Sequence, residues 1–399
     1  MLEQADSAAV GAIAERPRSI AADRVVTRGE RVLFLLSTLS IGGSERKVVK
    51  LSNALVREGR HVTVAYLNGP DPLKEQFDSK VELLNLERRG KFSASALRRL
   101  AEVVASKRID TIVAVNLYAM LYAALLKRIM RRAGSVRFLA SLNTTDFNTR
   151  KAKIQLVLYR PLLRSMDWLI FGAEYQRGLW RAQHLRRRAP SSSVLYNGVD
   201  TEHFSRNQVE PFRVPEWPAQ RIVIGTVGVF RPEKSHDLLL RAAAALVQRG
   251  HDIGVLLVGD GPQKSALRRL GADLKLDERI CFCGSASDVR PYLAAMDVFV
   301  LTSTAVETFS NAALEALAME CPVVCSAIGG MPEMVRDGGG RTFRIGDLNE
   351  LIVQLESMVV SKSSRALLAQ QGRASVLQRF SLDAMVSEFR ALIQSDLRS

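Results

Sequence analysis

The most informative part of the chain reads Asp297-Val-Phe-Val-Leu-Thr-Ser303 and, after a gap of three residues, Glu307-Thr-Phe-Ser-Asn-Ala-Ala-Leu-Glu315. The apolar run at residues 296–301 is typical of a buried strand. After Glu307 the chain leads into a helical pattern that continues through Met319. A strand that passes through a short loop into a helix is the repeating unit of α/β sheets, so this stretch predicts one such unit.

Two glutamates bracket the start of the expected helix. On one ideal helix, Glu307 and Glu315 would differ by about 80° in azimuth and about 12 Å in rise, and would not share a face. We therefore expect Glu307 on the loop and Glu315 in the first turns of the helix, with Thr308 or Ser310 as N-cap. A helix N-terminus between two carboxylates suits a ligand with hydroxyl groups at both ends and a diphosphate in the middle, as in a nucleotide-sugar. The alternative is two carboxylates with no joint role.

Three further motifs occur in order along the chain. They are Gly42-Gly43-Ser-Glu-Arg46, Asn197-Gly198-Val-Asp200 and Gly228-Val-Phe-Arg231-Pro-Glu-Lys234. Together with the stretch from Asp297 to Glu333, they closely resemble the retaining glycosyltransferases of family 4 (glycosyltransferase group 1), of the polysaccharide-biosynthesis type. The resemblance covers about residues 31–390. It implies the GT-B fold, an α/β architecture with two Rossmann-like parallel-sheet domains facing a central cleft.

Strand and helix patterns alternate in both halves of the chain, as in parallel α/β sheets. The segments with strand patterns are 31–37, 61–67, 111–115, 138–142, 222–227, 254–258, 280–283, 298–301 and 322–325. We expect a tail at 1–30, an N-terminal acceptor-side domain at 31–200 and a C-terminal nucleotide-sugar-binding domain at 201–378. By resemblance, residues 379–399 form a terminal helix that crosses back to the first domain.

The resemblance assigns catalytic roles to three residues. Arg231 and Lys234 would stabilise the negative charge on the departing diphosphate, which removes the need for a divalent metal. Glu307 would contact the hydroxyls of the transferred sugar and stabilise an oxocarbenium-like state. No metal or other cofactor is expected. Without the resemblance, the alternative interpretation is that Arg231 and Lys234 are solvated charges on a loop.

The remaining donor contacts follow from the same resemblance. Glu315 would accept hydrogen bonds from the ribose hydroxyls, and Gly42 and Gly43 would let backbone N–H groups approach the donor phosphate and the acceptor. A tight turn is the plainer interpretation of the two glycines. The other residues expected at the donor are Gly228 at the end of its strand, Phe309, Ser310 and Asn311 through their backbone N–H groups, and Cys281 through main-chain contact with the base.

One position departs from the family pattern. Many relatives carry a histidine after the strand equivalent to 138–142, whereas this chain continues with Asn143. Asn143 can hydrogen-bond a sugar or acceptor hydroxyl but cannot act as a base. A retaining front-face reaction needs no enzymic base, because the leaving phosphate takes the acceptor proton. The histidine nearest the motifs, His236, is interpreted as a helix-start residue and not as a catalyst.

The positive charge is concentrated in the first half of the chain. Residues 1–200 carry 34 Lys and Arg against 18 Asp and Glu, whereas residues 201–399 carry 22 against 23. Much of the excess falls in helix-like segments rich in aliphatic residues, at 96–108, 125–137, 150–164 and 177–188. Such segments favour peripheral association with an anionic membrane or an anionic acceptor, and a solvated helix face is the alternative. No nucleic-acid-binding motif stands out, so nucleic acid is not an expected partner.

Composition sets the remaining limits. A chain of 399 residues that is 47% hydrophobic predicts a globular protein of two domains, with no apolar run of 18 residues and no secretory signal. Cysteines occur at only four positions and lack paired CxxC spacing, so we interpret them as small buried core residues in a reducing compartment. These features favour a cytoplasmic protein, located at the inner face of the membrane when it meets its acceptor.

The sequence as a whole predicts a retaining hexosyltransferase that uses a nucleotide-diphosphate sugar, with UDP favoured. The acceptor would be a hydroxyl of a glycan or lipid-linked glycan in cell-surface polysaccharide biosynthesis. A GT-B nucleotide-sugar epimerase and a non-catalytic nucleotide-sugar-binding protein are the alternatives.

Overall fold

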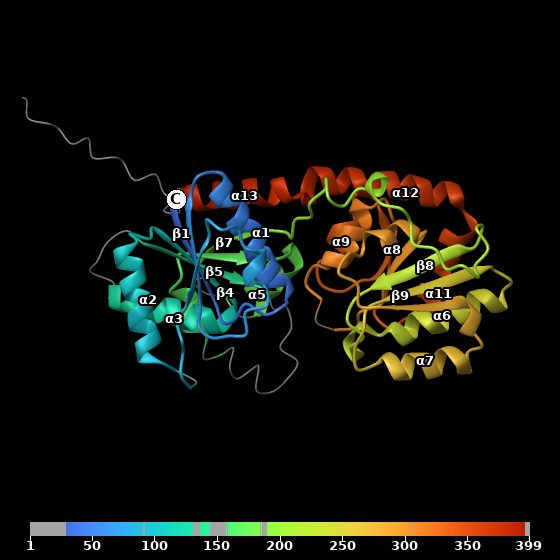
Figure 1. Ribbon diagram of the computed structural model, residues 1–399, viewed down its shortest axis with the longest axis horizontal. Coiled ribbons are helices and arrows are strands. Elements are labelled where there is room, and N and C mark those ends of the chain that lie inside the picture. Colours follow the sequence, from blue (N-terminus) through green and yellow to red (C-terminus); the bar gives the residue numbers. More distant parts are fainter. Residues whose placement is uncertain are drawn as a thin grey trace, which may run out of the picture.

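The computed structural model describes residues 29–90, 92–130, 136–143, 157, 159–183, 185, 190–305 and 307–395 (Figure 1). All but the last two residues of the expected N-terminal tail lie outside these ranges. Within them, no helix is both long and apolar enough to cross a membrane.

The first half of the chain folds into one seven-stranded parallel sheet with the strand order β3-β2-β1-β4-β5-β6-β7. Its strands are β1 (Arg31–Leu36), β2 (His61–Tyr66), β3 (Glu82–Asn85), β4 (Thr111–Val115), β5 (Arg137–Leu142), β6 (Trp168–Phe171) and β7 (Ser191–Val194). Helices α1 (Gly43–Arg57), α2 (Ala94–Ser106), α3 (Asn116–Ile129) and α5 (Glu174–Gln183) connect them. The central strands are buried on both faces, which is why they read as continuous apolar runs in the sequence.

The second half forms a six-stranded parallel sheet with the order β10-β9-β8-β11-β12-β13. Its strands are β8 (Ile222–Val227), β9 (Ile253–Val258), β10 (Ile280–Gly284), β11 (Val298–Leu301), β12 (Val323–Ser326) and β13 (Gly340–Phe343). The helices of this half are α6 (His236–Gln248), α7 (Lys264–Asp273), α8 (Arg290–Ala295), α9 (Asn311–Ala318), α10 (Met331–Val335), α11 (Leu348–Val360) and α12 (Lys362–Ser375). Two parallel-sheet domains of this kind confirm the predicted fold class.

The last helix, α13 (Leu382–Gln394), returns to the first domain (Figure 1). Phe389 stacks on Phe34 of β1 with ring centroids 5.6 Å apart, so the helix completes the core of the first sheet. The chain therefore crosses between the domains twice. At the crossing, Val199 N–H donates to the Phe380 carbonyl (2.9 Å) and Leu382 N–H donates to the Val199 carbonyl (2.7 Å). The domain boundaries at 200 and 378 stay a prediction.

One expected helix is wrong in its bounds. The basic segment 125–137 begins inside α3, but α3 ends at Ile129 and Arg137 already begins β5. The Arg137 guanidinium is buried and donates to Thr111 Oγ1 (3.1 Å) and to the Ser395 carbonyl after α13 (3.0 Å). This cation therefore contributes to the packing of the terminal helix and not to a basic surface.

Candidate active site between the two domains

The carboxyl ends of the strands in both sheets face the boundary between the domains, where hydrogen bonds cross from one to the other. Thr308 Oγ1 donates to the Asn143 carbonyl (3.0 Å), and Asn197 Nδ2 donates to the Phe309 carbonyl (3.1 Å). In open α/β sheets, ligands bind at this end of the strands. The predicted site residues of the two domains thus come from opposite sides of one boundary.

Glu307 and Lys234 form the most tightly connected part of the site. Glu307 lies on the loop after β11, as predicted, and its side chain is only 10% exposed. Lys234 Nζ donates to Glu307 Oε2 (2.5 Å), and Ser303 Oγ donates to the same oxygen (3.2 Å). A buried carboxylate is costly unless it is paired and hydrogen-bonded, and here both conditions hold.

The Lys234 loop is attached to the Glu307 loop along its backbone as well. Thr302 Oγ1 donates to the Lys234 carbonyl (2.8 Å), and Thr304 N–H donates to the Glu233 carbonyl (2.9 Å). Lys234 ends a short 3-10 turn, η4 (Pro232–Lys234), just before Ser235 with a positive φ of 48°. These contacts fix the two loops relative to each other, although 73 residues separate Lys234 from Glu307.

Arg231 lies in a different environment from Lys234. Its side chain is 61% exposed, and its nearest acidic partner is Glu233 at 3.9 Å. The structure therefore places one of the two expected cations in a buried ion pair and the other at the surface beside it. An exposed guanidinium remains available to an anionic ligand.

Gly228 lies where the loop after β8 approaches the loop after β9. A Cβ added to Gly259 would lie 1.9 Å from the Gly228 carbonyl oxygen, and the φ of Gly259 is +141°. Phe230 N–H donates to the Asp260 carbonyl (2.9 Å). Only glycine fits at position 259, so this turn after β9 sets the position of the Gly228–Lys234 loop.

Helix α9 begins as the sequence suggested. Its N-cap is Ser310, whose Oγ accepts from Ala313 N–H (3.4 Å), while Thr308 makes the interdomain contact instead. Of the two N-cap candidates, the structure thus selects Ser310. Asn311 is the first residue of the helix and Glu315 lies in its second turn.

Glu315 faces the basic residues of α1. Burial raises the pKa of its carboxyl, and the charges of Lys50 and Arg46 partly oppose that rise. Among the described residues, none donates a hydrogen bond to the Glu315 side chain. Its carboxylate is thus free to accept hydrogen bonds from a ligand.

Phe309 contributes mainly through its side chain. The ring is buried and packs against Tyr196 and Phe380, with centroids 5.1 and 5.3 Å away. This aromatic cluster lies where the chain crosses between the domains. The predicted contact of the Phe309 N–H with a ligand stays a prediction.

The N-terminus of α1 forms the first-domain side of the site. Gly42 is its N-cap and makes no side-chain cap bond. A Cβ added to Gly43 would lie 3.5 Å from Asn311 Nδ2, so the first turns of α1 and α9 face each other. The Glu45 carboxylate folds back over Gly42, and burial raises the pKa of Glu45.

Two lysines of α1 were missed by the sequence reasoning. Lys50 Nζ donates to the Gly198 carbonyl (2.8 Å), and Lys47 Nζ donates to the Leu195 carbonyl. Burial lowers the pKa of Lys47 to about 7, although Glu388 opposes this. In the sequence, Lys47 precedes the apolar pair Val48 and Val49, but its partner lies 148 residues away, so the sequence did not indicate the contact.

Asn143 and His236 lie where the sequence suggested, at the end of β5 and at the start of α6. Asn143 Nδ2 is 3.5 Å from Asn116 Oδ1. His236 is buried against Phe230, and this burial, together with Lys234, lowers its pKa to about 4. The imidazole is therefore neutral near pH 7.

Cys281 lies inside β10, paired with Leu256 of β9. It is half-buried and lines a hollow of about 700 Å³ together with Trp217 and Glu216. The cysteines are thus of two kinds. Cys321 and Cys325 are fully buried as expected, but the expectation is wrong for Cys281 and Cys283, which β10 leaves half-buried because it is the outermost strand of its sheet.

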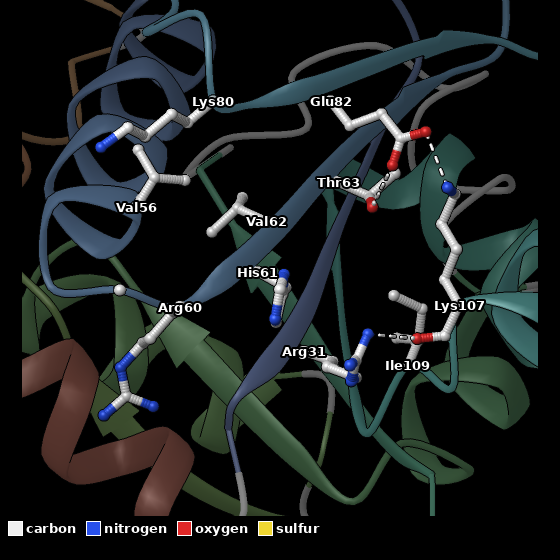
Figure 2. Close-up of a pocket in the computed structure, with 11 residues that line it drawn as sticks. Arg31, Val56, Arg60, His61, Val62, Thr63, Lys80, Glu82, Lys107 and Ile109 are labelled. Atoms are coloured by element: carbon white, nitrogen blue, oxygen red, sulfur yellow. Dashed lines mark hydrogen bonds and ion pairs between the residues drawn. The ribbon is translucent and has the colours of Figure 1, made fainter.

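A second hollow, of about 380 Å³, lies at the amino ends of the first sheet, opposite the candidate site (Figure 2). Its lining includes the cations Arg31, Arg60, Lys80 and Lys107. Lys107 pairs with Glu82 at 2.7 Å. This hollow is part of the basic first half and contains none of the predicted site residues.

Two family models match successive parts of the chain. The model described as "Glycosyltransferase Family 4" matches residues 41–203, and "Glycosyl transferases group 1" matches residues 221–360. A structure of HepE from Anabaena in complex with UDP matches with a TM-score of 0.78 at 21% identity, covering 92% of this chain and all of that one. A glycosyltransferase from Rickettsia africae matches with a TM-score of 0.77 at 15% identity, over 92% and 98% of the two chains.

Relatives by sequence include a lipopolysaccharide core glycosyltransferase and a synthase that makes a glucosaminyl malate. The lipopolysaccharide core biosynthesis glycosyltransferase LpsE of Rhizobium meliloti is 34% identical over 179 residues, which cover 45% of this chain and 51% of LpsE. N-acetyl-alpha-D-glucosaminyl L-malate synthase of Bacillus anthracis is 27% identical over 51% of this chain and 54% of its own length. The chain therefore spans about half the length of these two relatives.

The fold and the two family models define a class, the GT-B glycosyltransferases. Within that class, the chain belongs to family 4 (glycosyltransferase group 1).

Proposed function

We propose that this protein is a retaining glycosyltransferase that transfers a hexose from a nucleotide-diphosphate sugar, with UDP favoured, to a glycan or lipid-linked glycan hydroxyl. The observation that carries the proposal is the grouping of Glu307, Lys234 and Glu315 around the N-terminus of α9. Family membership supports the reaction type. HepE, whose structures hold UDP and UDP-glucose, shares the fold.

The reaction breaks the bond between the anomeric carbon and the diphosphate oxygen. The acceptor hydroxyl attacks that carbon on the same face, and its proton passes to the departing phosphate oxygen. Arg231 and Lys234 carry the positive charge that stabilises the developing phosphate charge. This step needs no enzymic base, which agrees with Asn143 in place of the family histidine.

The Lys234–Glu307 ion pair has a role in this scheme. Without a donor, the half-buried Lys234 neutralises the buried Glu307. When the donor binds, the Lys234 ammonium group donates a further hydrogen bond to the phosphate. The Glu307 carboxylate accepts hydrogen bonds from the sugar hydroxyls. The ion pair thus holds both side chains in place before the donor binds, which lowers the entropy lost in ordering them on binding.

The decisive assay measures free nucleotide release with and without acceptor. A transferase releases nucleotide efficiently only when a suitable acceptor is present. Epimerisation of the sugar, with no acceptor dependence, would instead identify a GT-B epimerase. Tight donor binding with no turnover across an acceptor panel would identify a binding protein.

The donor is identified by thermal stabilisation across a panel of nucleotide-sugars. A ligand at one hundred times its Kd adds about 2.7 kcal/mol to the free energy of unfolding, which is easily detected. Chelation with EDTA is expected to leave turnover unchanged. Loss of turnover on chelation, restored by Mg²⁺ or Mn²⁺, would contradict a metal-independent mechanism.

We also propose that the protein works at the cytoplasmic face of an anionic membrane. The net charge of the first 200 residues supports this, as does Ile129, which is 63% exposed next to the exposed Arg128 at the end of α3. An apolar side chain beside a cation suits the headgroup region. Binding to anionic but not zwitterionic vesicles, reversed by salt, is the expected result.

Charge reversal at Arg128, Arg131 and Arg132 should reduce this vesicle binding and spare nucleotide binding. The last two residues, and the other basic cluster at 186–188, lie outside the described residues. Vesicle binding that does not depend on lipid charge or on salt concentration would contradict the proposal.

A further inference from the structure

The two cysteines of β10 form a pair of thiols on one side of the strand. Their sulfur atoms are 3.7 Å apart. The spacing results from an irregularity in the strand, because Phe282 pairs with Leu257 and Gly284 pairs with the next residue, Val258. Cys283 is thus left as an extra, unpaired residue, as in a β-bulge. Such a bulge bends the strand and redirects the side chain at that position.

The pair is accessible from outside the fold. β10 is the outermost strand of the second sheet, and both thiols are half-buried. Cys281 lines the 700 Å³ hollow described above. By contrast, Cys321 and Cys325 are completely buried. A thiol-directed reagent therefore meets two distinct classes of cysteine in one chain.

We propose that Cys281 and Cys283 form a dithiol site that binds soft, thiophilic centres through both sulfur atoms. Tetrahedral bonds of about 2.3 Å to one metal centre would separate two sulfur ligands by about 3.8 Å, close to the observed distance. Among the described residues, no group of three or more His, Cys, Asp or Glu side chains is placed to hold a metal ion. The site therefore supplies two ligands, which suits a trivalent arsenical with two open valences.

The state of the thiols supports this chemistry. The hydrogen bond from Cys283 lowers the pKa of Cys281 to about 7, so a large fraction of Cys281 is thiolate near neutral pH. The same contact raises the pKa of Cys283. One sulfur is thus prepared to attack first, and its neighbour closes the ring.

The reaction with phenylarsine oxide balances without an oxidant. Each thiol gives up one proton, two arsenic–sulfur bonds form, and the arsenic-bound oxygen leaves as one molecule of water. Arsenic remains trivalent throughout.

The dithiol is connected to the candidate active site by a short path. The Gly284 carbonyl, next to Cys283, accepts a hydrogen bond from Gly259 N–H (2.8 Å). Gly259 in turn lies against the Gly228 carbonyl. If the proposed function holds, bridging the two sulfurs displaces the bulge and weakens nucleotide-sugar binding severalfold.

The test uses the reduced full-length protein, phenylarsine oxide and native mass spectrometry. We expect one equivalent of the arsenical, retained in excess glutathione and released by dithiothreitol, because only a second dithiol competes with two-point attachment. Cys281→Ser and Cys283→Ser should each bind on the order of 10²-fold more weakly, since linking two contacts adds this factor or more. The control Cys321→Ala/Cys325→Ala should retain one equivalent.

Three outcomes would overturn the site: no uptake by the wild type, equal retention by either serine variant, or an arsenical mapped to Cys321 or Cys325. Equal melting temperatures of the serine variants and the wild type show that any loss is local. Nucleotide affinity unchanged by the arsenical would overturn the coupling to the active site. Uptake is measured without nucleotide, so failure of the proposed transferase activity leaves the stoichiometry result intact and distinguishable.

Discussion

The two sides of the candidate site are built differently. On the second-domain side, the N-terminus of α9 is capped by Ser310, and the adjoining loop is bonded to the Gly228–Lys234 loop through Lys234, Glu307 and Thr302. On the first-domain side, the N-cap of α1 is Gly42, which has no side chain to cap the helix, and the Glu45 carboxylate folds back over it.

The α9 side is therefore preorganised for a ligand, whereas the α1 side can adjust to one. The α9 side holds Lys234 and Glu307 in fixed positions, as expected where one common donor must be oriented for reaction. On the α1 side, the Glu45 carboxylate accepts from its own backbone N–H, whereas the preceding N–H groups have no capping side chain, so a ligand or acceptor group can satisfy those. The fixed side would thus serve the donor, and the adjustable side would accommodate the acceptor.

The largest loss of turnover is expected from substitutions on the α9 side. Lys234→Ala should lower turnover on the order of 10²-fold or more, because it removes a charge that stabilises the leaving group and leaves Glu307 unpaired. Arg231→Ala should also cost on the order of 10²-fold in turnover. Steady-state kinetics on both variants provide the measurement, with Lys362→Ala, an exposed lysine of α12, as control. Full turnover in Lys234→Ala would contradict the assigned role.

The next effect separates the two carboxylates. Glu315→Gln should weaken nucleotide binding roughly tenfold, because an amide accepts a ribose hydroxyl less strongly than a carboxylate does. Glu307→Gln should lower turnover while the affinity for free nucleotide stays nearly unchanged. Calorimetric titration with the free nucleotide distinguishes the two. Equal loss of affinity in both variants would remove the proposed division of roles.

The next effect is on stability and concerns the anchoring of α1 by Lys47. Burial lowers the folded-state pKa of Lys47 to about 7, well below that of an unfolded lysine. Between pH 7 and about 10, the unfolded chain binds the extra proton, so the free energy of unfolding rises with pH over this window. Lys47→Met should flatten that rise and stabilise the protein below pH 7. Chemical denaturation at several pH values measures this, and an unchanged slope would mean that Lys47 stays charged when folded.

The smallest effect tests the helix cap itself. Ser310→Ala should lower the free energy of unfolding by about 1 kcal/mol, as loss of an N-cap does. The matched change near the start of α1, Ser44→Ala, should alter it by less than about 0.5 kcal/mol, because Ser44 is not a cap residue. Similar losses in both variants would show that the two helix ends are not held differently.

The sequence predicted the central strands well, since continuous burial on both faces leaves an unmistakable apolar run. It missed the shorter strands β3, β6, β7 and β13. β7 reads Ser191-Ser-Ser-Val194 and carries no apolar pattern. Its backbone pairs with β6, and its Ser193 hydroxyl accepts from Trp168 Nε1 (3.0 Å), so polar contacts hold it in the sheet.

The loop position of Glu307 and the helix position of Glu315 were predicted because capping residues and periodicity are local signals. The ion pair between Lys234 and Glu307 was not, since it depends on how two distant loops pack. The same applies to Lys47 and Lys50, whose partners are backbone carbonyls 148 residues away. Long-range polar contacts of this kind leave no periodic trace in a sequence.

The double crossing between the domains has a mechanical consequence. Residues near Val199 and residues 380–382 are bonded to each other, and a Cβ on Gly198 would lie only 2.9 Å from Met385. Two connectors locked side by side cannot slide past one another, so they act as one joint and leave rotation about their common axis as the softest mode. The aromatic ring of Phe309 packs on Phe380 at this joint. Gly43 and Asn311 face each other across the domain boundary, so rotation about the joint would change the distance between them.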